Sequence, residues 1–480
     1  MSPSSDRYDF TIHTYGCKVN TYDTGLLQKR FESKGHRAIA SDVKATSPSS
    51  DEQVDGFGGF GLGIRVPRIH VLNTCAVTAE ATREAAKAVR RIKSKDPFST
   101  VVVTGCGAQV DGAVFDELPG ADLVVANSHK GSLESLLDQH FKGELQTKVF
   151  RSNIFRKDDL EAGGGVEMGH TRAFLKIQDG CNSFCTYCVI PFARGKSRSI
   201  PARDLARRVR ELHEQGAAEV VLTGVHIGDY EDERAGVKLG LAGLVTEILE
   251  TTKIPRIRLS SLEPVELTPE VLALYRNDRM CPHFHMSIQS ANTRVLSAMR
   301  RHYDAEAVET ALNAISEQIP GAFVGMDVIA GFPGETDDEF ADTYERLARL
   351  PWTRIHVFPY SERPGTKAVA LEGSVPREVR MLRSQRLRAL SSERLAEMAR
   401  AQIGSIKKVL LLKSGVDGLS RDYWPVRLDV GVLSSDELHR LVSHVGTEVE
   451  VTITSFDESD SSRMDGVLIG RLASAQVLHD

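Results

Sequence analysis

Short apolar segments alternate with amphipathic helical segments through most of this chain, and this alternation limits the folds it can adopt. In the first part, the candidate strands YDFTIHTYG, RIHVLNTC and STVVVTGC are separated by helical patterns over residues 23–34 and 79–94. Such an order is typical of a parallel sheet covered by helices. We therefore predict an N-terminal parallel α/β domain over residues 7–148. Within it, Ser, Pro, Asp and Gly dominate residues 41–67, which predicts a flexible surface insertion.

The alternation continues on a larger scale over residues 167–400. Helical patterns of ten or so residues separate six further candidate strands, which are AFLKIQDG, EVVLTGVHI, RIRLSSLE, HFHMSIQS, FVGMDVIAGFPG and RIHVFPYS. Six strand-helix units predict an open or partial (β/α)6 barrel, in which active-site residues lie at the carboxyl ends of the strands. Over residues 403–473 the pattern changes to short β-type runs with turn residues between them, which predicts a small all-β barrel. The fold class is thus a multidomain α/β protein.

Composition excludes several classes of protein. The N-terminus lacks an apolar signal core, and no apolar stretch approaches the length of a membrane span. We expect a cytoplasmic monomer that has no membrane association. The net charge of −5 argues against general polyanion binding but allows local basic patches. The seven cysteines are expected to be ligands, catalysts or buried thiols, because the cytoplasm keeps thiols reduced.

Three cysteines lie close together in CNSFCTYC, at Cys181, Cys185 and Cys188. Three thiolates can hold three irons of a cubic 4Fe-4S cluster, whereas clusters that only transfer electrons normally have four. The open iron can be chelated by S-adenosylmethionine (SAM), and an electron delivered to its sulfonium then yields a 5′-deoxyadenosyl radical. The alternative is a structural zinc site in which a histidine supplies the fourth ligand. Zinc sites usually contain two paired motifs, which this spacing does not match.

Cys17, Cys75 and Cys106 each follow the end of an apolar candidate strand. In an open parallel sheet the loops at the carboxyl ends of the strands share one edge, so these three residues can converge in space. They would then form a second group of three thiolates. The alternative is that each is a small buried residue at a strand end. Cys281 matches neither group and is expected to be a core thiol.

The segment CNSFCTYCVIPFARGKSRS, together with GCKVN, NTCAVT and GCGAQ, resembles the methylthiotransferase branch of the radical SAM superfamily. The resemblance covers nearly the whole chain apart from residues 41–67. It implies SAM and two 4Fe-4S clusters as cofactors, one held by Cys181, Cys185 and Cys188 and the other by Cys17, Cys75 and Cys106. The C-terminal segment resembles the TRAM domain of these enzymes, which contacts RNA.

The resemblance also implies residues that contact the cofactor and the RNA. The loops VIAGFPGET, LTGVHIGDY and SIQSAN follow barrel strands, and glycines in them let a ligand approach the backbone. The residues expected to contact SAM are Tyr187, Thr223, Gln289, Ser290, Ile329, Gly331 and Pro333. Positive charge suits phosphate and aromatic rings stack on bases. The residues expected to contact RNA are Arg194, Lys196, Arg198, Tyr423 and Arg427. Trp424 is equally consistent with a core position.

The segment HTYGCKVN is similar to the branch that acts on N6-threonylcarbamoyladenosine, although Tyr15 replaces a leucine. This implies insertion of a methylthio group at carbon 2 of that adenosine, which occupies position 37 of tRNA. The implied partners are tRNA and an electron donor such as a flavodoxin or ferredoxin system. Alternative substrates are isopentenyladenosine in tRNA and a small-subunit ribosomal protein. A non-catalytic iron-sulfur RNA-binding regulator and a zinc-stabilised RNA-binding protein are the alternatives from other classes.

Overall fold

The computed structural model describes residues 7–39, 67–156, 171–234, 236–412, 414–432, 439, 441–459 and 466–473. The chain divides into two compact units. The first consists of Met1–Lys157 and Phe192–Gly195, and the second of Asp158–Pro191 and Lys196–Asp480. The predicted domains at 167–400 and 403–473 therefore both fall within the second unit, apart from Phe192–Gly195. The predicted insertion at residues 41–67 lies outside the described residues, except for Pro67.

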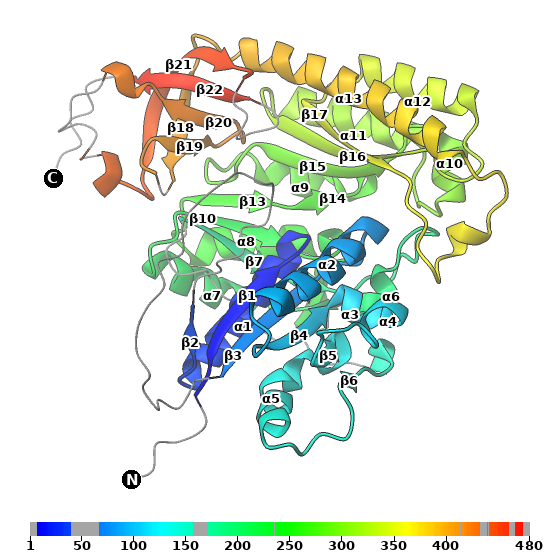
Figure 1. The fold of residues 1–480 in the computed structure, drawn as a ribbon. Helices are drawn as coiled ribbons and strands as arrows, with labels where there is room; N and C mark the ends of the chain where they lie inside the picture. Colours follow the sequence, from blue (N-terminus) through cyan, green and yellow to red (C-terminus); the bar gives the residue numbers. More distant parts are fainter. Residues whose placement is uncertain are drawn as a thin grey trace. The chain divides into compact units, whose positions relative to one another are not determined.

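The first unit contains a six-stranded sheet in which all neighbouring strands are parallel, as the alternation predicts. It is coloured blue to cyan in Figure 1. The order of strands in the sheet is β2 (Arg37–Ala38), β1 (Asp9–Thr14), β3 (Arg68–Thr74), β4 (Thr100–Gly105), β5 (Leu123–Ala126) and β6 (Val149–Phe150).

Helices cover both faces of this sheet. On one face, Val101 and Val103 of β4 pack in a cluster with Val89 and Ile92 of α2 (Ala79–Lys95). On the other face, Val71 and Val102 pack with residues of α1 (Lys18–Ser33) and α5 (Leu133–Phe141). Both faces of a parallel sheet are normally buried in this way, and each buried aliphatic side chain contributes about 1.5–3 kcal/mol. Packing on both faces holds the sheet in place and thereby fixes the positions at which its strands end.

In two sheets of the second unit the six predicted barrel strands form seven short ones, because Ser260 divides the third; the end of the first continues as β8 (Gln178–Asp179) outside these sheets. All of their pairings are parallel. One sheet has the order β13-β10-β7, and the other has the order β14-β15-β16-β17. Their bounds are β7 (Arg172–Lys176), β10 (Glu219–Thr223), β13 (Arg256–Leu259), β14 (Ser261–Leu262), β15 (His283–Gln289), β16 (Phe323–Ala330) and β17 (Arg354–Pro359). The helices between them include α7 (Ala202–Glu214), α8 (Leu241–Thr251), α11 (Ala305–Gln318) and α12 (Asp337–Arg349).

A closed five-stranded barrel follows the long helix α13 (Arg377–Arg400), as the short β-type runs predict. Figure 1 shows it in orange and red. Its strands, in barrel order, are β18 (Ile406–Leu411), β19 (Asp417–Ser420), β20 (Pro425–Leu428), β22 (Val467–Leu472) and β21 (Glu448–Asp457). Trp424 is 5% exposed and packs in its core with Leu395 and Ala399 of α13, so the core interpretation of this tryptophan is confirmed. The helices among the described residues all lack the combination of length and apolarity that a bilayer span requires.

A buried charge cluster joins this barrel to β10 and β13. The carboxylate of Glu219 is fully buried and forms ion pairs with Arg172 at 2.7 Å, Arg256 at 2.9 Å and Arg258 at 3.0 Å. Arg256 also pairs with Glu448 at 3.0 Å and donates to the carbonyl of Leu419 at 3.1 Å, both in the C-terminal barrel. Burial would raise the pKa of Glu219, but the three arginines outweigh it and hold the pKa well below its usual range.

We predict that Glu219→Gln destabilises the protein by about 3–5 kcal/mol, because it leaves buried arginines without their shared anion. Thermal unfolding followed by calorimetry measures this as a lower Tm. Since the folded-state pKa of Glu219 is depressed, its contribution is present above the unfolded-state pKa and is lost as the pH falls through the folded-state value. Glu231→Gln is the matched control, since Glu231 pairs with Lys238 at the surface. Equal Tm values for the two variants would contradict the account.

Two candidate metal centres formed by cysteine triads

The three N-terminal cysteines lie at one edge of the first sheet. Strands β1 and β3 pair with Thr14 opposite Asn73, and β3 and β4 pair with Thr74 opposite Gly105. The chain thus leaves each strand at nearly the same level, and Cys17, Cys75 and Cys106 follow within three residues. Cys17 is the N-cap of α1, and Cys106 begins the short helix α3 (Cys106–Val110). The predicted convergence is therefore confirmed as a matter of position.

Two glycines allow the loops at this edge to approach closely. Gly16 and Gly105 immediately precede Cys17 and Cys106 and have φ values of +98° and +95°. A Cβ atom on Gly16 would lie 2.6 Å from Cβ and 2.7 Å from Sγ of Cys75. No side chain fits there, and the left-handed conformation itself favours glycine. The backbone therefore holds the loops of Cys17 and Cys75 against each other.

The pKa values of Cys75 and Cys106 reflect how close the cysteine loops lie to one another. Burial, and then the nearby sulfur of Cys106, raise the pKa of Cys75 to about 11. Burial also raises the pKa of Cys106, while the charge of Arg194 acts in the opposite direction on both thiols. Three soft donors at one place suit zinc or an iron-sulfur cluster, and a bound cation would stabilise their charged forms.

The second triad lies on a loop between β8 (Gln178–Asp179) and α6 (Ile190–Arg194). Thr186 fixes this loop: its backbone N–H donates to the carbonyl of Met299 at 3.0 Å and its hydroxyl to that of Ala298 at 2.9 Å. Both carbonyls belong to the end of α10 (Thr293–Ala298). Phe184 adopts φ +46°, a conformation that is uncommon for a residue with a side chain. The rest of the unit thus determines how the loop presents its thiols.

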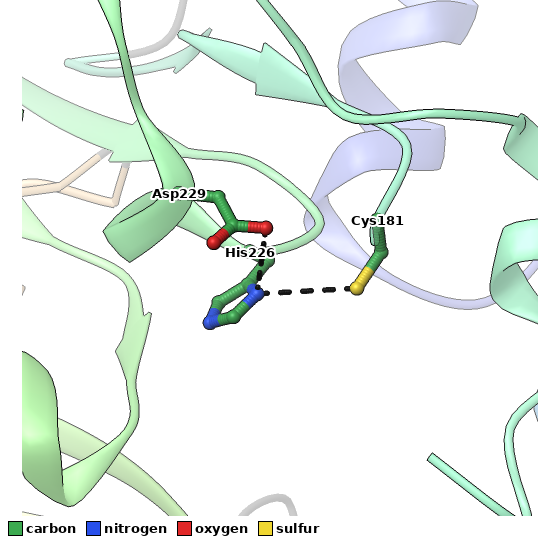
Figure 2. Close-up of side chains that lie close together, drawn as sticks. All are labelled: Cys181, His226 and Asp229. Carbon is green, nitrogen blue, oxygen red and sulfur yellow. Dashed lines mark hydrogen bonds and ion pairs between the residues drawn. The ribbon is translucent and has the colours of Figure 1, made fainter. Parts of the chain in front are cut away.

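Figure 2 shows the surroundings of Cys181. Its Sγ lies 3.9 Å from Nδ1 of His226, which in turn lies 3.2 Å from a carboxylate oxygen of Asp229. The other ring nitrogen of His226 contacts Glu266. Burial works against the charged imidazole, but hydrogen bonds to Asp229, Cys181 and Glu266 outweigh it and raise the pKa of His226. The histidine in turn overcomes the effect of burial on Cys181 and lowers the pKa of this thiol.

A histidine next to Cys181 is also what the zinc alternative requires, so the other ligands near His226 are relevant. In a tetrahedral zinc site the ligand atoms lie about 4 Å apart, given Zn–S bonds of about 2.3 Å. Among the described residues, the groups of three ligands within 4.8 Å of one another are Cys181–His226–Asp229 and His226–Glu263–Glu266. Neither contains a second cysteine. The residues that surround His226 are therefore mainly carboxylates, and only one thiol of the triad lies with them.

The sequence interpretation missed Arg301 and Glu263. Nη1 of Arg301 donates to Sγ of Cys185 at 3.2 Å, and Nη2 pairs with Glu263 at 2.7 Å. Tyr303 accepts from Nε of Arg301 at 2.9 Å. Glu263 follows β14 directly, so its position at the carboxyl end of a barrel strand is the signal that could have identified it, whereas Arg301 follows α10 and has no such signal. A cation and a carboxylate thus lie together beside the triad.

Several residues that were expected to contact SAM come together near this loop. The ring of Tyr187 packs edge to face on Phe332 at 6.4 Å, and Ile329 belongs to the same cluster. The turn that follows is held by Gly331, at φ +75°, whose N–H donates to Glu335 at 2.8 Å. Pro333 is buried in this turn. Tyr187, Ile329 and Phe332 thus belong to one apolar cluster, and Gly331 and Pro333 lie in the turn beside Phe332.

The other residues expected to contact SAM are Gln289, Thr223 and Ser290, and they differ in burial. Gln289, at φ +63°, ends β15 and is only half-buried. Thr223 is buried at the end of β10. Ser290 is also buried, and its hydroxyl lies 3.3 Å from that of Thr343 and accepts from the N–H of Asn292. Ser290 is therefore engaged with α12, so Gln289 is the better placed of the two to contact a ligand.

The residues expected to contact RNA mostly have partners within the protein. Arg194 is 4% exposed and bonds to Asn20 and Asp23 within the first unit, which corrects the expectation that its charge faces RNA. The ring of Tyr423 lies 4.0 Å from that of His283 and under the guanidinium of Arg258, so it packs against the barrel strands. Arg427 pairs with Asp417 at 3.0 Å. Arg198 is half-buried and Lys196 is exposed.

Two family models match this chain. The Radical SAM superfamily matches residues 175–347, which include the second triad. The model described as Uncharacterized protein family UPF0004 matches residues 65–126, which include Cys75 and Cys106. Each triad therefore lies, wholly or in part, in a segment that recurs in other proteins.

The chain is also similar to curated proteins over most of its length. The threonylcarbamoyladenosine tRNA methylthiotransferase MtaB of Aquifex aeolicus is 36% identical over 404 residues, which cover 84% of this chain and 92% of that protein. The protein of the same name from Bacillus subtilis is 35% identical, with 81% of each covered. A tRNA-2-methylthio-N(6)-dimethylallyladenosine synthase from Erythrobacter litoralis is 29% identical, with 86% of this chain and 89% of that protein covered.

Among solved structures, the radical SAM methyltransferase TsrM of Kitasatospora setae, with cobalamin and a [4Fe-4S] cluster bound, is similar in fold. The TM-score is 0.53 at 14% sequence identity, and the match covers 76% of this chain and 77% of that one. At this identity the similarity concerns the fold alone.

We predict that in metal-free protein iodoacetamide alkylates Cys181 at least about tenfold faster than Cys188 at pH 8, because the thiolate is the reactive form. Burial raises the pKa of Cys188 to about 12, whereas hydrogen bonds from His226 and Ser183 lower that of Cys181 against the effect of burial. Mass spectrometry of the modified peptides over time measures both rates. His226→Ala is expected to slow only Cys181. Equal rates in the unsubstituted protein would contradict this description of the loop.

Proposed function

Because the chain belongs to the family of radical SAM methylthiotransferases and is an enzyme of that kind, we propose that it acts on N6-threonylcarbamoyladenosine at position 37 of tRNA. It replaces the hydrogen on carbon 2 of this adenosine with a methylthio group. The observation that carries the proposal is the presence of two separate groups of three cysteines. The group around Cys181 serves the generation of a radical, and the group around Cys75 serves the delivery of sulfur.

The choice of substrate is supported by two observations. The relatives with the higher identities are named for threonylcarbamoyladenosine, and the first triad begins in the segment HTYGCKVN. The names of relatives describe those proteins, so isopentenyladenosine in tRNA and a small-subunit ribosomal protein remain the alternatives that experiment must separate. Carbon 2 carries no acidic proton, so general acid-base catalysis does not readily reach it and a radical is needed.

The residues around the second triad suit SAM. A 4Fe-4S cluster on Cys181, Cys185 and Cys188 supplies the electron for the reductive cleavage of SAM when both are bound. Arg301 and Glu263 lie as a pair beside Cys185, and their charges are complementary to the carboxylate and ammonium groups of the methionyl part. Tyr187 and Ile329, which are partly buried members of one apolar cluster, offer an apolar surface to the adenine.

The first triad provides the second half of the reaction. Cys17, Cys75 and Cys106 would hold a second 4Fe-4S cluster, which would provide a site for the sulfur to be inserted. Two molecules of SAM would be needed for each product, one as the source of the methyl group and the other as the source of the radical. The protein keeps Cys75 and Cys106 buried, while Cys17 is exposed. Burial of two of the three ligands shelters the sulfur chemistry from water.

Lys196, Arg198 and the C-terminal barrel are the parts proposed to contact tRNA. Lys196 is exposed, and positive charge at this point of the chain suits a phosphate. We further propose that the enzyme is a cytoplasmic monomer that receives electrons from a flavodoxin or ferredoxin system.

We predict that anaerobically reconstituted protein binds about eight irons and eight sulfides, and that the Cys181→Ala, Cys185→Ala, Cys188→Ala triple variant binds about four of each. Iron and sulfide assays on the purified proteins measure this. Cys281→Ala is the control and is expected to keep all eight, since Cys281 is buried near Glu219, with 3.9 Å between its Sγ and the carboxylate. A protein that contains zinc and no sulfide would refute the proposal.

We also predict that the chain restores 2-methylthio-N6-threonylcarbamoyladenosine to the tRNA of a bacterial strain that lacks this modification. The triple variant is expected not to restore it, because it cannot generate the radical. Mass spectrometry of digested tRNA nucleosides measures the product. If isopentenyladenosine or a ribosomal protein is methylthiolated instead, that molecule is the substrate and the proposed one is wrong. Reduced protein that forms no 5′-deoxyadenosine from SAM would support the non-catalytic regulator.

A further inference from the structure

A short segment after the second triad forms part of the first compact unit. Phe192–Gly195 belongs to that unit, although the residues on both sides of it belong to the second. Ala193 is fully buried, and the guanidinium of Arg194 is buried with it. A cation is costly to bury unless specific partners receive it. The partners of this segment therefore indicate what it does there.

Arg194 bonds to two residues of α1. Its Nη2 donates to Oδ1 of Asn20 at 2.7 Å and to Oδ2 of Asp23 at 3.1 Å. Lys130 approaches the same carboxylate oxygen of Asp23 at 3.3 Å. All four side chains are buried. Two cations thus converge on one carboxylate in the interior of the first unit.

Asn20 connects Arg194 to two of the three N-terminal cysteines. The amide Nδ2 of Asn20 donates to the carbonyl of Tyr15 at 2.7 Å and to that of Thr74 at 3.1 Å. Tyr15 precedes Cys17 by two residues, and Thr74 immediately precedes Cys75. Because Arg194 binds the oxygen of the same amide, it fixes which way the amide faces. The bond to Arg194 thereby holds the loops of both cysteines together.

Ala193 connects the segment to the third cysteine. Its carbonyl accepts from Nδ2 of Asn127 at 2.9 Å, and the same nitrogen lies 3.6 Å from Sγ of Cys106. Two adjacent residues, Ala193 and Arg194, therefore contact the polar side chains that support all three cysteine loops. The charge of Arg194 also acts on the thiols, since it opposes the rise that burial causes in the pKa of Cys75 and Cys106.

We propose that Arg194 completes the N-terminal metal centre as a positioning residue. By its buried charge and its bond to Asn20, it raises the reduction potential of the cluster held by Cys17, Cys75 and Cys106. The reduced cluster carries one more negative charge, which a nearby fixed cation stabilises, and charge and hydrogen bonds near the sulfurs are known to set such potentials. The inference rests on the proposed function, because it requires that cluster.

Arg194 is distant in sequence from the three N-terminal cysteines but close in sequence to the second triad. Arg194 follows Cys188 by six residues, so the loop that carries the radical-site cysteines continues directly into the segment that supports the other site. The N-terminal residues alone therefore contain the three thiols but lack the cation that completes their surroundings.

The test uses the full-length Cys181→Ala, Cys185→Ala, Cys188→Ala variant as background, because it retains only the N-terminal cluster. Redox titration followed by electron paramagnetic resonance compares this background with the same protein carrying Arg194→Gln. We expect the ratio of reduced to oxidised cluster at a fixed potential to fall about tenfold, which corresponds to a midpoint about 59 mV lower for a one-electron couple. Arg194→Lys, which keeps the charge, is expected to produce a smaller shift. Lys196→Gln, an exposed cation two residues away, is expected to produce none.

An Arg194→Gln variant that keeps four irons and the background midpoint would overturn the inference. If Arg194→Gln loses its iron, the comparison of Arg194→Lys with the background decides: a midpoint at or slightly below that of the background supports the inference, and a raised one overturns it. A background protein that binds no iron would show that the proposed function has failed at an earlier step. The iron assay therefore separates the two failures.

Discussion

The parallel pairing of β1, β3 and β4 is the constraint on which the chemistry of the first unit depends. The register places Thr14 opposite Asn73 and Thr74 opposite Gly105, so cysteines from three distant parts of the sequence follow at one edge. The positive φ angles of Gly16 and Gly105 let these loops close on one another. The second unit uses the same principle, since His226, Glu263 and Gln289 all lie at or just beyond the carboxyl ends of barrel strands.

Each of the two sites offers three thiolates, and the seventh cysteine is not available to either of them. Cys281 is buried beside Glu219, in the charge cluster that joins β10 and β13 to the C-terminal barrel. A cluster with three protein thiolates retains an iron to which a substrate or cofactor can bind. The proposed reaction needs such an iron twice, once for the cleavage of SAM and once for sulfur. Under this proposal, three rather than four thiolates at each site are a functional requirement.

Strand periodicity and motif spacing were sufficient to predict the sheet, the six barrel strands, the C-terminal barrel and the convergence of Cys17, Cys75 and Cys106. They could not predict where charged loop residues go. Arg194 follows a cysteine loop and reads as a surface cation, yet the chain returns to the first unit at this point and buries it. Arg256 and Arg258 lie in the predicted strand RIRLSSLE, but only the folded chain shows that both donate to carbonyls of the C-terminal barrel. Such contacts depend on residues more than 150 positions apart in the sequence.

The proposed chemistry requires two metal centres, each with three cysteine ligands, and diffraction at the iron absorption edge tests this most directly. Crystals of anaerobically reconstituted protein are expected to give two compact peaks of anomalous scattering. One peak should be surrounded by the sulfurs of Cys17, Cys75 and Cys106, and the other by those of Cys181, Cys185 and Cys188. A single peak, or a lone metal ion that takes His226 as a fourth protein ligand, would contradict the account.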